Sequence, residues 1–240
     1  MSKGRFVYHE LRVPDVAAAA MFYGELFGWT AVDTPTGKLF RAGDTVIGGV
    51  SAVKPHVPPH WSGYVAVDDV TATLTGAKEH GGIVTTDDGE PIDAPGHGLL
   101  APVLDTVNKA VFVVTGPRPV TNGPKIGTFV WDRLHTADPT ASVAFYQKVL
   151  PWTAILNSDG SSGGFRLTDG TMAADMVPAG QDPSRWLAFV LVEDLDRIRT
   201  KANDLGAHVL VRQESFPGDS GDFSVIADPQ GAEIGFCQTS

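Results

Sequence analysis

Two short segments with a strand-like pattern carry the side chains best suited to chemistry. In the first, Glu10 and Arg12 are two residues apart, so alternation along a strand places them on one face. A carboxylate surrounded by aromatic groups has a raised pKa and can act as a general acid or base, unless the nearby guanidinium reverses that shift. The alternative is that Glu10 and Arg12 only neutralise each other or contact a neighbouring module.

The second segment holds Arg133 and His135 with the same spacing. An ordinary histidine titrates near neutral pH and passes protons, so His135 is the second candidate for acid–base catalysis. A structural role, or a place at the rim of a site, is the alternative. Other chemistries are not supported: the glycine-rich run 160–164 lacks the Lys-Ser/Thr of a phosphate loop, and Cys237, the only cysteine, has no adjacent histidine.

The charge balance favours small molecules as partners. Eighteen lysines and arginines against 28 aspartates and glutamates give a net charge of -10 without a basic run, so nucleic acid and anionic membranes are not expected as partners. No apolar run approaches the roughly 18 to 20 residues of a membrane helix, and residues 1–10 lack the apolar core of a signal peptide. We expect a cytoplasmic protein, either a monomer or a homodimer.

The elements that position these residues occur twice in the sequence. The pattern D-x-x-A-x-x-x-F-Y-x-x-x-x-x-W-T-A starts at Asp15 and again at Asp138. Residues 5–13 predict a strand, Asp15 a helix cap, and residues 16–27 a helix that Gly28 ends. Three short strands follow, and this β-α-β-β-β unit recurs. We therefore predict modules at 1–116 and 125–240, joined by a proline- and glycine-rich linker at 117–124.

These paired units, the helix ending in G-W and the closing run D-P-Q-G-A of residues 228–232 resemble the vicinal oxygen chelate superfamily. That superfamily includes glyoxalase I, extradiol dioxygenases and bleomycin-resistance proteins, and the two-module form is similar to actinobacterial proteins labelled glyoxalase-like or hydroxylases. The resemblance implies an α+β fold: two tandem modules, each of two β-α-β-β-β units that form a curved mixed sheet around a cup.

The resemblance also implies where a metal ion would be held, and those positions carry unsuitable residues. In metal-dependent members, His, Gln or Glu on the first, fourth, fifth and eighth strands bind a divalent ion. The corresponding residues are Tyr8, Gly48 or Gly49, Ser62 and Phe112 in the first module, and Trp131, Ala173 or Ala174, Leu187 and Gly235 in the second. His9 is one residue out of register and is expected on the helix-facing side. We expect neither a metal site nor another cofactor.

Alternation predicts largely aromatic walls for the two cups, typical of a site for a flat or hydrophobic molecule. The predicted ligand-binding residues are Tyr8, Arg12, Ser62, Tyr64 and Phe112 in the first module, with Trp131, Arg133, Phe189 and Glu233 in the second. Glu233 is expected to join Arg133 and His135. His56 and His60 are expected to be solvent-exposed, whereas His97 is either exposed or part of a lid over the first cup.

Three functions remain open on this basis. The first is a binding protein that sequesters a small hydrophobic or aromatic molecule without a metal, as bleomycin-resistance proteins of the superfamily do. The second is a metal-independent enzyme of secondary metabolism, a lyase, isomerase or hydroxylase-like protein, in which Glu10 or His135 handles protons. The third, a metal-dependent glyoxalase or dioxygenase, is the least favoured because the ligand positions are unsuitable.

Overall fold

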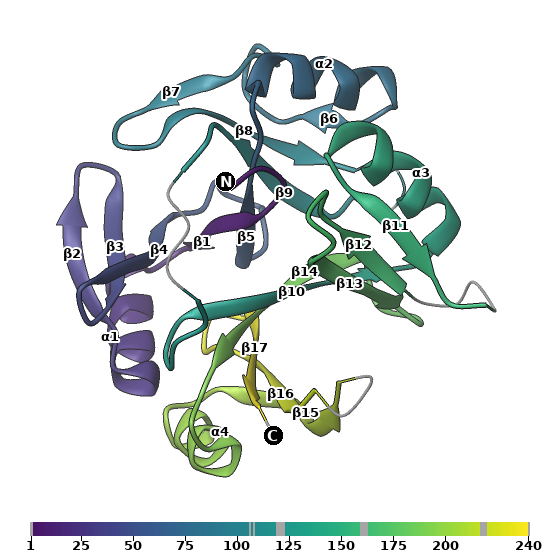
Figure 1. Ribbon diagram of the computed structural model, residues 1–240. Helices are drawn as coiled ribbons and strands as arrows, with labels where there is room; N and C mark the ends of the chain where they lie inside the picture. The colour runs from purple at the N-terminus through teal and green to yellow at the C-terminus, as the bar shows by residue number, and fades with distance from the viewer. Residues whose placement is uncertain are drawn as a thin grey trace. The chain divides into compact units, whose positions relative to one another are not determined.

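The computed structural model describes residues 2–105, 107, 109–118, 123–158, 163–216 and 220–239. Residues 119–122 of the predicted linker and residues 160–162 of the glycine-rich run lie outside these ranges. The first repeat contains β1 (Phe6–Val13), α1 (Val16–Phe27), β2 (Thr30–Thr34), β3 (Gly37–Ala42), β4 (Thr45–Ala52), β5 (His60–Ala66), α2 (Val70–Glu79), β6 (Ile83–Val84), β7 (Ile92–Ala94), β8 (Gly98–Leu104) and β9 (Val111–Thr115) (Figure 1).

The second repeat contains β10 (Phe129–Thr136), α3 (Pro139–Val149), β11 (Thr153–Leu156), β12 (Gly163–Arg166), β13 (Met172–Pro178), β14 (Arg185–Leu191), α4 (Leu195–Asp204), β15 (His208–Ser215), β16 (Asp222–Ala227) and β17 (Glu233–Gln238). No helix in the ranges described is both long enough and apolar enough to cross a membrane.

An aspartate begins the helix in each of the four motifs. The side chains of Asp15, Asp69, Asp138 and Asp194 each accept a hydrogen bond from the backbone N–H three residues further on. Such a cap stabilises a helix by about 1 kcal/mol, because it satisfies an N–H that has no partner within the helix. The predicted helix over residues 16–27 is confirmed, and it ends where Gly28 adopts a left-handed conformation with φ 74°.

The strands form mixed sheets in which the order repeats. In the first repeat the order is β2-β3-β4-β1-β5-β9-β8-β6, and in the second it is β11-β12-β13-β10-β14-β17-β16-β15. The pairs β1–β4, β5–β9, β10–β13 and β14–β17 are parallel, whereas the pairs within each run of short strands are antiparallel. The expected α+β fold of two tandem modules is confirmed. An unexpected strand, β7, forms an antiparallel pair with β8.

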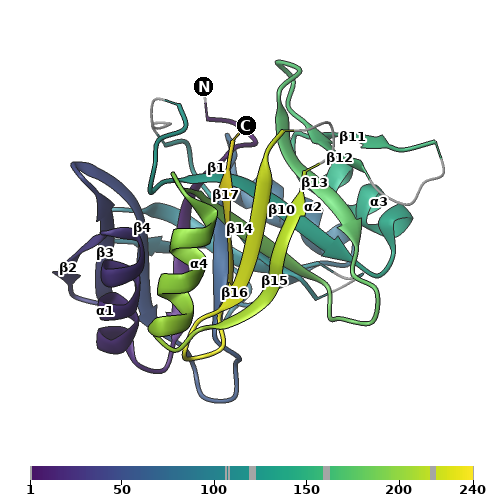
Figure 2. The same cartoon turned by 90° about the horizontal axis from the view of Figure 1, so that it is seen from below.

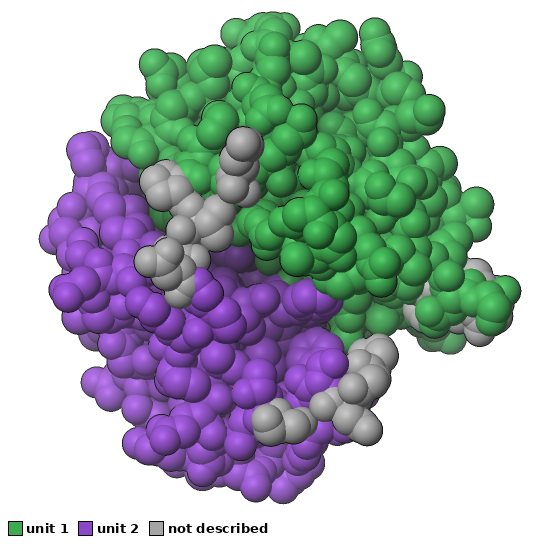
Figure 3. Space-filling model, viewed as in Figure 1, with its two compact units in different colours: residues 1–8, 62–121, 132–186 green, residues 9–61, 122–131, 187–240 purple. Residues whose placement is uncertain are grey.

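The chain forms two compact units, and each takes one motif from each repeat (Figure 3). Unit 1 comprises Met1–Tyr8, Ser62–Thr121 and Asp132–Trp186, and unit 2 comprises His9–Trp61, Asn122–Trp131 and Leu187–Ser240. Helices α2 and α3 contact each other in unit 1. Helices α1 and α4 contact each other in unit 2, and Figure 2 shows them side by side. We call the face of each sheet that packs on its helices the helix-facing side, and the opposite face the inner side.

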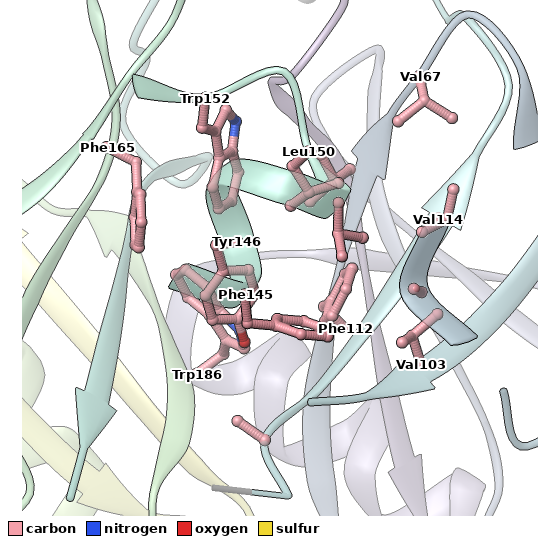
Figure 4. Close-up of a cluster of buried hydrophobic side chains, with 14 of the residues drawn as sticks. Val67, Val103, Phe112, Val114, Phe145, Tyr146, Leu150, Trp152, Phe165 and Trp186 are labelled. Carbon is pink, nitrogen blue, oxygen red and sulfur yellow. The ribbon is translucent and has the colours of Figure 1, made fainter. Parts of the chain in front are cut away.

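The helix-facing core of unit 1 joins residues of the two repeats (Figure 4). Tyr146 of α3 is fully buried, donates a hydrogen bond of 2.8 Å to the Asp105 carboxylate and accepts one of 2.9 Å from Trp186 Nε1. Trp152 Nε1 donates to the Gly4 carbonyl at 2.7 Å. Trp152 is therefore part of the buried scaffold of unit 1.

Unit 2 contains the same hydrogen-bond network, but here the first repeat supplies the helix tyrosine and the second repeat supplies the carboxylate. Tyr23 of α1 donates to the Asp228 carboxylate at 3.0 Å and accepts from Trp61 Nε1 at 3.1 Å. Trp29 Nε1 donates to the Gly127 carbonyl at 2.7 Å. Burial raises the pKa of Asp228, because this carboxylate lies in a low-dielectric core.

Candidate functional site

Four side chains of unit 1 form an aromatic and basic group, which we call the Tyr–His–Arg cluster: Tyr8, Tyr64, His97 and Arg118. The ring centroid of Tyr8 lies 5.1 Å from that of Tyr64 and 4.9 Å from that of His97, and both contacts are edge-to-face. The Arg118 guanidinium carbon lies 5.5 Å from the centre of the Tyr8 ring, within the range of a cation–π contact. The cluster therefore combines buried tyrosine rings with a half-buried positive charge.

Strand alternation places the two tyrosines of the cluster, and a hairpin places the histidine. Val65 packs in the helix-facing core, so its neighbour Tyr64 points to the inner side. Ala94 of β7 pairs with Gly98 of β8, which makes the segment between them a tight turn. Gly96 and Gly98 adopt positive φ there, and His97 N–H donates to the Ala94 carbonyl at 2.8 Å. The hairpin thus holds His97 beside Tyr8.

A polar group in unit 2 surrounds Glu10, the first acid–base candidate. Ser51 donates a hydrogen bond of 2.6 Å to Glu10 Oε1, and Arg12 Nη2 lies 3.5 Å from the same oxygen. The pKa of half-buried His60 is lowered by burial; the Pro58 carbonyl and Glu10 oppose this shift, and Arg12 adds to it. His60 is therefore not the fully exposed loop residue that the sequence predicted. Glu10 and Arg12 are brought together as expected.

The second acid–base candidate, His135, lies in unit 1 beside charges of its own repeat. Burial, Arg185 and Arg133 lower the pKa of His135 to about 4, and Asp182 only partly opposes them. The expectation that His135 titrates near neutral pH is wrong, because desolvation and two guanidinium groups disfavour the imidazolium. Its Nε2 atom is buried without a hydrogen-bond partner among the residues described.

Arg133 forms an ion pair that the sequence did not predict. Its Nε and Nη2 donate to the Asp175 carboxylate at 3.0 and 2.6 Å, and both side chains are largely buried. The predicted partner, Glu233, belongs to unit 2. Asp175 pairs with Arg133 across the parallel strands β10 and β13. Alternation along β13 was the signal that could have identified Asp175, because Ala174 and Met176 occupy the helix-facing core.

The predicted aromatic residues Trp131 and Phe189 lie together in unit 2, in a packed cluster. The ring of Phe189 lies 5.4 Å from those of both Phe216 and Phe223, and Phe189 is fully buried. A Cβ atom at Gly235 would come within 2.3 Å of the Phe189 ring, so this ring fills the space above the glycine. These residues pack mainly against one another.

The structure corrects the placement of Phe112 and supports that of Ser62. Phe112 was expected on the cup side, but it is fully buried in the helix-facing core, with its ring 5.6 Å from that of Tyr146. The prediction placed Phe112 one residue out of register on its strand, and a shift of one residue reverses the face on which a side chain lies. Ser62 is buried and shares a face of β5 with Tyr64.

The positions that the resemblance assigns to metal ligands do not fit a divalent ion. The ring of Tyr8 packs on Tyr64 and His97, Phe112 is in the core, and the first-module positions on β4 are glycines. His9, the nearest alternative, stacks on Phe129 at 4.1 Å on the helix-facing side. Within the described ranges, no three His, Cys, Asp or Glu side chains gather as a metal site would require.

Comparison with known families gives one match in each repeat. Residues 5–115 match the model of the Glyoxalase/Bleomycin resistance protein/Dioxygenase superfamily, and residues 128–237 match that of a Glyoxalase-like domain. CFP32 of Mycobacterium tuberculosis, whose name describes it as a glyoxylase, is 29% identical over 239 residues. The alignment covers 93% of this chain and 90% of CFP32. The anthracycline biosynthesis protein DnrV of Streptomyces peucetius is 28% identical over 262 residues and covers 95% and 91%.

Solved structures share the fold at low sequence identity. The Mn(II)-bound glyoxalase from Novosphingobium aromaticivorans is 16% identical with a TM-score of 0.69, and the alignment covers 99% of this chain and 83% of that one. The 2,3-dioxygenase LapB from Pseudomonas sp. KL28 is 12% identical with a TM-score of 0.68 and coverage of 100% and 94%.

Proposed function

Because the chain belongs to the glyoxalase/bleomycin resistance protein/dioxygenase superfamily in both of its repeats, we propose that it binds a small aromatic molecule through its first repeat and without a metal ion. The observation that carries this proposal is the Tyr–His–Arg cluster. Edge-to-face aromatic surfaces with a few polar atoms are typical of sites for planar organic ligands.

The aromatic cluster around Phe189 differs from the Tyr–His–Arg cluster in ways that favour the first repeat as the binding site. The cluster around Phe189 consists of apolar and aromatic residues, whereas Arg118 and His97 add a guanidinium and an imidazole, both half-buried, to the buried rings of Tyr8 and Tyr64. A ligand needs polar groups for orientation as well as an apolar surface. Relatives such as DnrV, a biosynthesis protein by name, are compatible with a small organic ligand.

Binding of two probes of the same shape, 2-naphthoate and 2-naphthamide, tests this proposal by isothermal titration calorimetry. We expect at least one probe to bind the wild-type protein. His97→Ala should weaken that binding about threefold to tenfold, because one edge-to-face contact contributes about 0.5 to 1.5 kcal/mol.

The matched control is His208→Ala, which removes an exposed imidazole from β15 of unit 2 and should leave the affinity unchanged. If neither probe binds the wild-type protein at millimolar concentration, or if His97→Ala and His208→Ala behave alike, the proposal fails.

A second candidate function, metal-independent acid–base catalysis, is favoured by the contacts of Glu10. Its carboxylate is held by Ser51 and Arg12, and its charge acts on the imidazole of His60. A positioned carboxylate of this kind is a candidate general base for a small organic substrate. Glu10→Gln retains the shape of the side chain and should lower turnover of any substrate found by at least about a hundredfold. An unchanged turnover rate in this variant would remove Glu10 as the proton carrier.

A further inference from the structure

Arg118 follows β9 and lies among uncharged groups of unit 1. Its backbone N–H donates to Ser2 Oγ at 3.1 Å, and its guanidinium lies over the Tyr8 ring. Nη2 reaches the Gly96 carbonyl only at 3.4 Å, near the outer limit of a hydrogen bond. The guanidinium is thus held in place by an aromatic ring and one weak carbonyl contact.

The charge of Arg118 has no counter-ion among the residues described. No carboxylate of the described ranges lies within ion-pair distance of its guanidinium, and Nε is buried without a hydrogen-bond acceptor. By contrast, Arg133 is neutralised by Asp175. Burial lowers the pKa of Arg118, since removing the guanidinium from water disfavours its charge. A half-buried cation with an unused N–H is costly unless an anion binds there.

We propose that Arg118 binds the carboxylate of an aromatic acid whose ring packs on the half-buried His97 of the Tyr–His–Arg cluster. The inference rests on the proposed function and narrows it to one ligand class. A guanidinium presents Nε–H and one Nη–H as a fork that matches the two oxygens of a carboxylate. Nε is buried and has no acceptor among the residues described, and Nη2 has only a long contact, so no strong hydrogen bond within the described residues competes with such a pair.

The net charge of the whole protein does not explain a preference for a carboxylate over a neutral ligand. A chain with a net charge of -10 repels anions at long range, so its overall field does not favour a carboxylate over a neutral ligand. Any preference for the acid must therefore come from a nearby cation.

The two naphthalene probes decide the question, because they have one shape and differ in charge. We expect the wild-type protein to bind 2-naphthoate about ten to a hundred times more tightly than 2-naphthamide, the range that charge-assisted hydrogen bonds provide. Arg118→Gln should remove this preference, so that the two probes bind within about threefold of each other. Arg118→Lys keeps the charge without the fork and should retain a reduced preference.

Arg197→Gln is the matched control, because it changes the net charge equally at an exposed site on α4 of unit 2. It should keep the full preference for 2-naphthoate. Equal affinity of the two probes for the wild-type protein would overturn the role of Arg118 while leaving the proposed function intact. The role of Arg118 would also be overturned if the Arg118→Gln protein still bound 2-naphthoate more tightly than 2-naphthamide. Failure of both probes to bind the wild-type protein would overturn both proposals.

Discussion

At the scale of residues, the sequence identified side chains by type and face, and it missed those that depend on distant neighbours. Tyr8 and Tyr64 are in contact, and Glu10 lies beside Arg12, because strand alternation is a local property. Arg118 was not a candidate, since it lies in the predicted linker, and only the fold brings it over Tyr8. Asp175 and His60 were missed for the same reason.

His135 gives a prediction of pH dependence. Its pKa of about 4 lies below the usual 6.5, so the unfolded chain takes up this proton at a higher pH than the folded protein does. The contribution to stability is fully present above pH 6.5 and is lost as the pH falls from 6.5 to about 4, by at most about 3 kcal/mol. His135→Gln should flatten this part of the curve of unfolding free energy against pH, measured by urea denaturation.

The comparison for this prediction is His208→Gln, in which an exposed histidine is replaced. It should leave the slope of the wild-type curve between pH 6.5 and 4 unchanged. A His135→Gln protein with the same slope as the wild type would show that the imidazole is not desolvated.

At the scale of elements, the predicted motifs were largely correct because helix caps and strand alternation depend on residues only a few positions apart in the sequence. Asp15 caps the start of α1 and Gly28 ends it, and the corresponding aspartates cap the starts of the other helices. The exception is β7, whose three residues form a strand only because they pair with β8. That hairpin carries His97, so an element that the sequence did not predict positions a residue of the proposed site.

At the scale of the whole molecule, the compact units do not coincide with the repeats. The network around Tyr23 needs Asp228, and the network around Tyr146 needs Asp105. In each case the helix belongs to one repeat and the carboxylate to the other. The helix-facing cores of both units therefore depend on both repeats.

A chain divided within residues 117–124 tests this dependence. When residues 1–116 and 125–240 are produced together as separate chains, they should co-purify through a tag on one of them, because both cores need both chains. Either fragment alone should lack a cooperative thermal transition, since it would leave the apolar sides of its helices uncovered. Calorimetry and size-exclusion chromatography measure the two properties.

The double variant Tyr23→Phe/Tyr146→Phe serves as the comparison for the divided chain. It removes both buried hydroxyl groups and should weaken association of the fragments. A monomeric fragment 1–116 that melts cooperatively by itself would contradict the shared cores.

The sequence by itself determined the duplication, the order of the motifs, the helix boundaries and the residue types on each strand face, because these follow from interactions between residues close in the chain. Tertiary structure alone decided which motifs share a core, which carboxylate neutralises Arg133, and that Arg118 lies over Tyr8 without a counter-ion in the part of the chain that the structure describes. These outcomes depend on burial and on contacts between distant segments, which determine the energy of a charge or an aromatic ring.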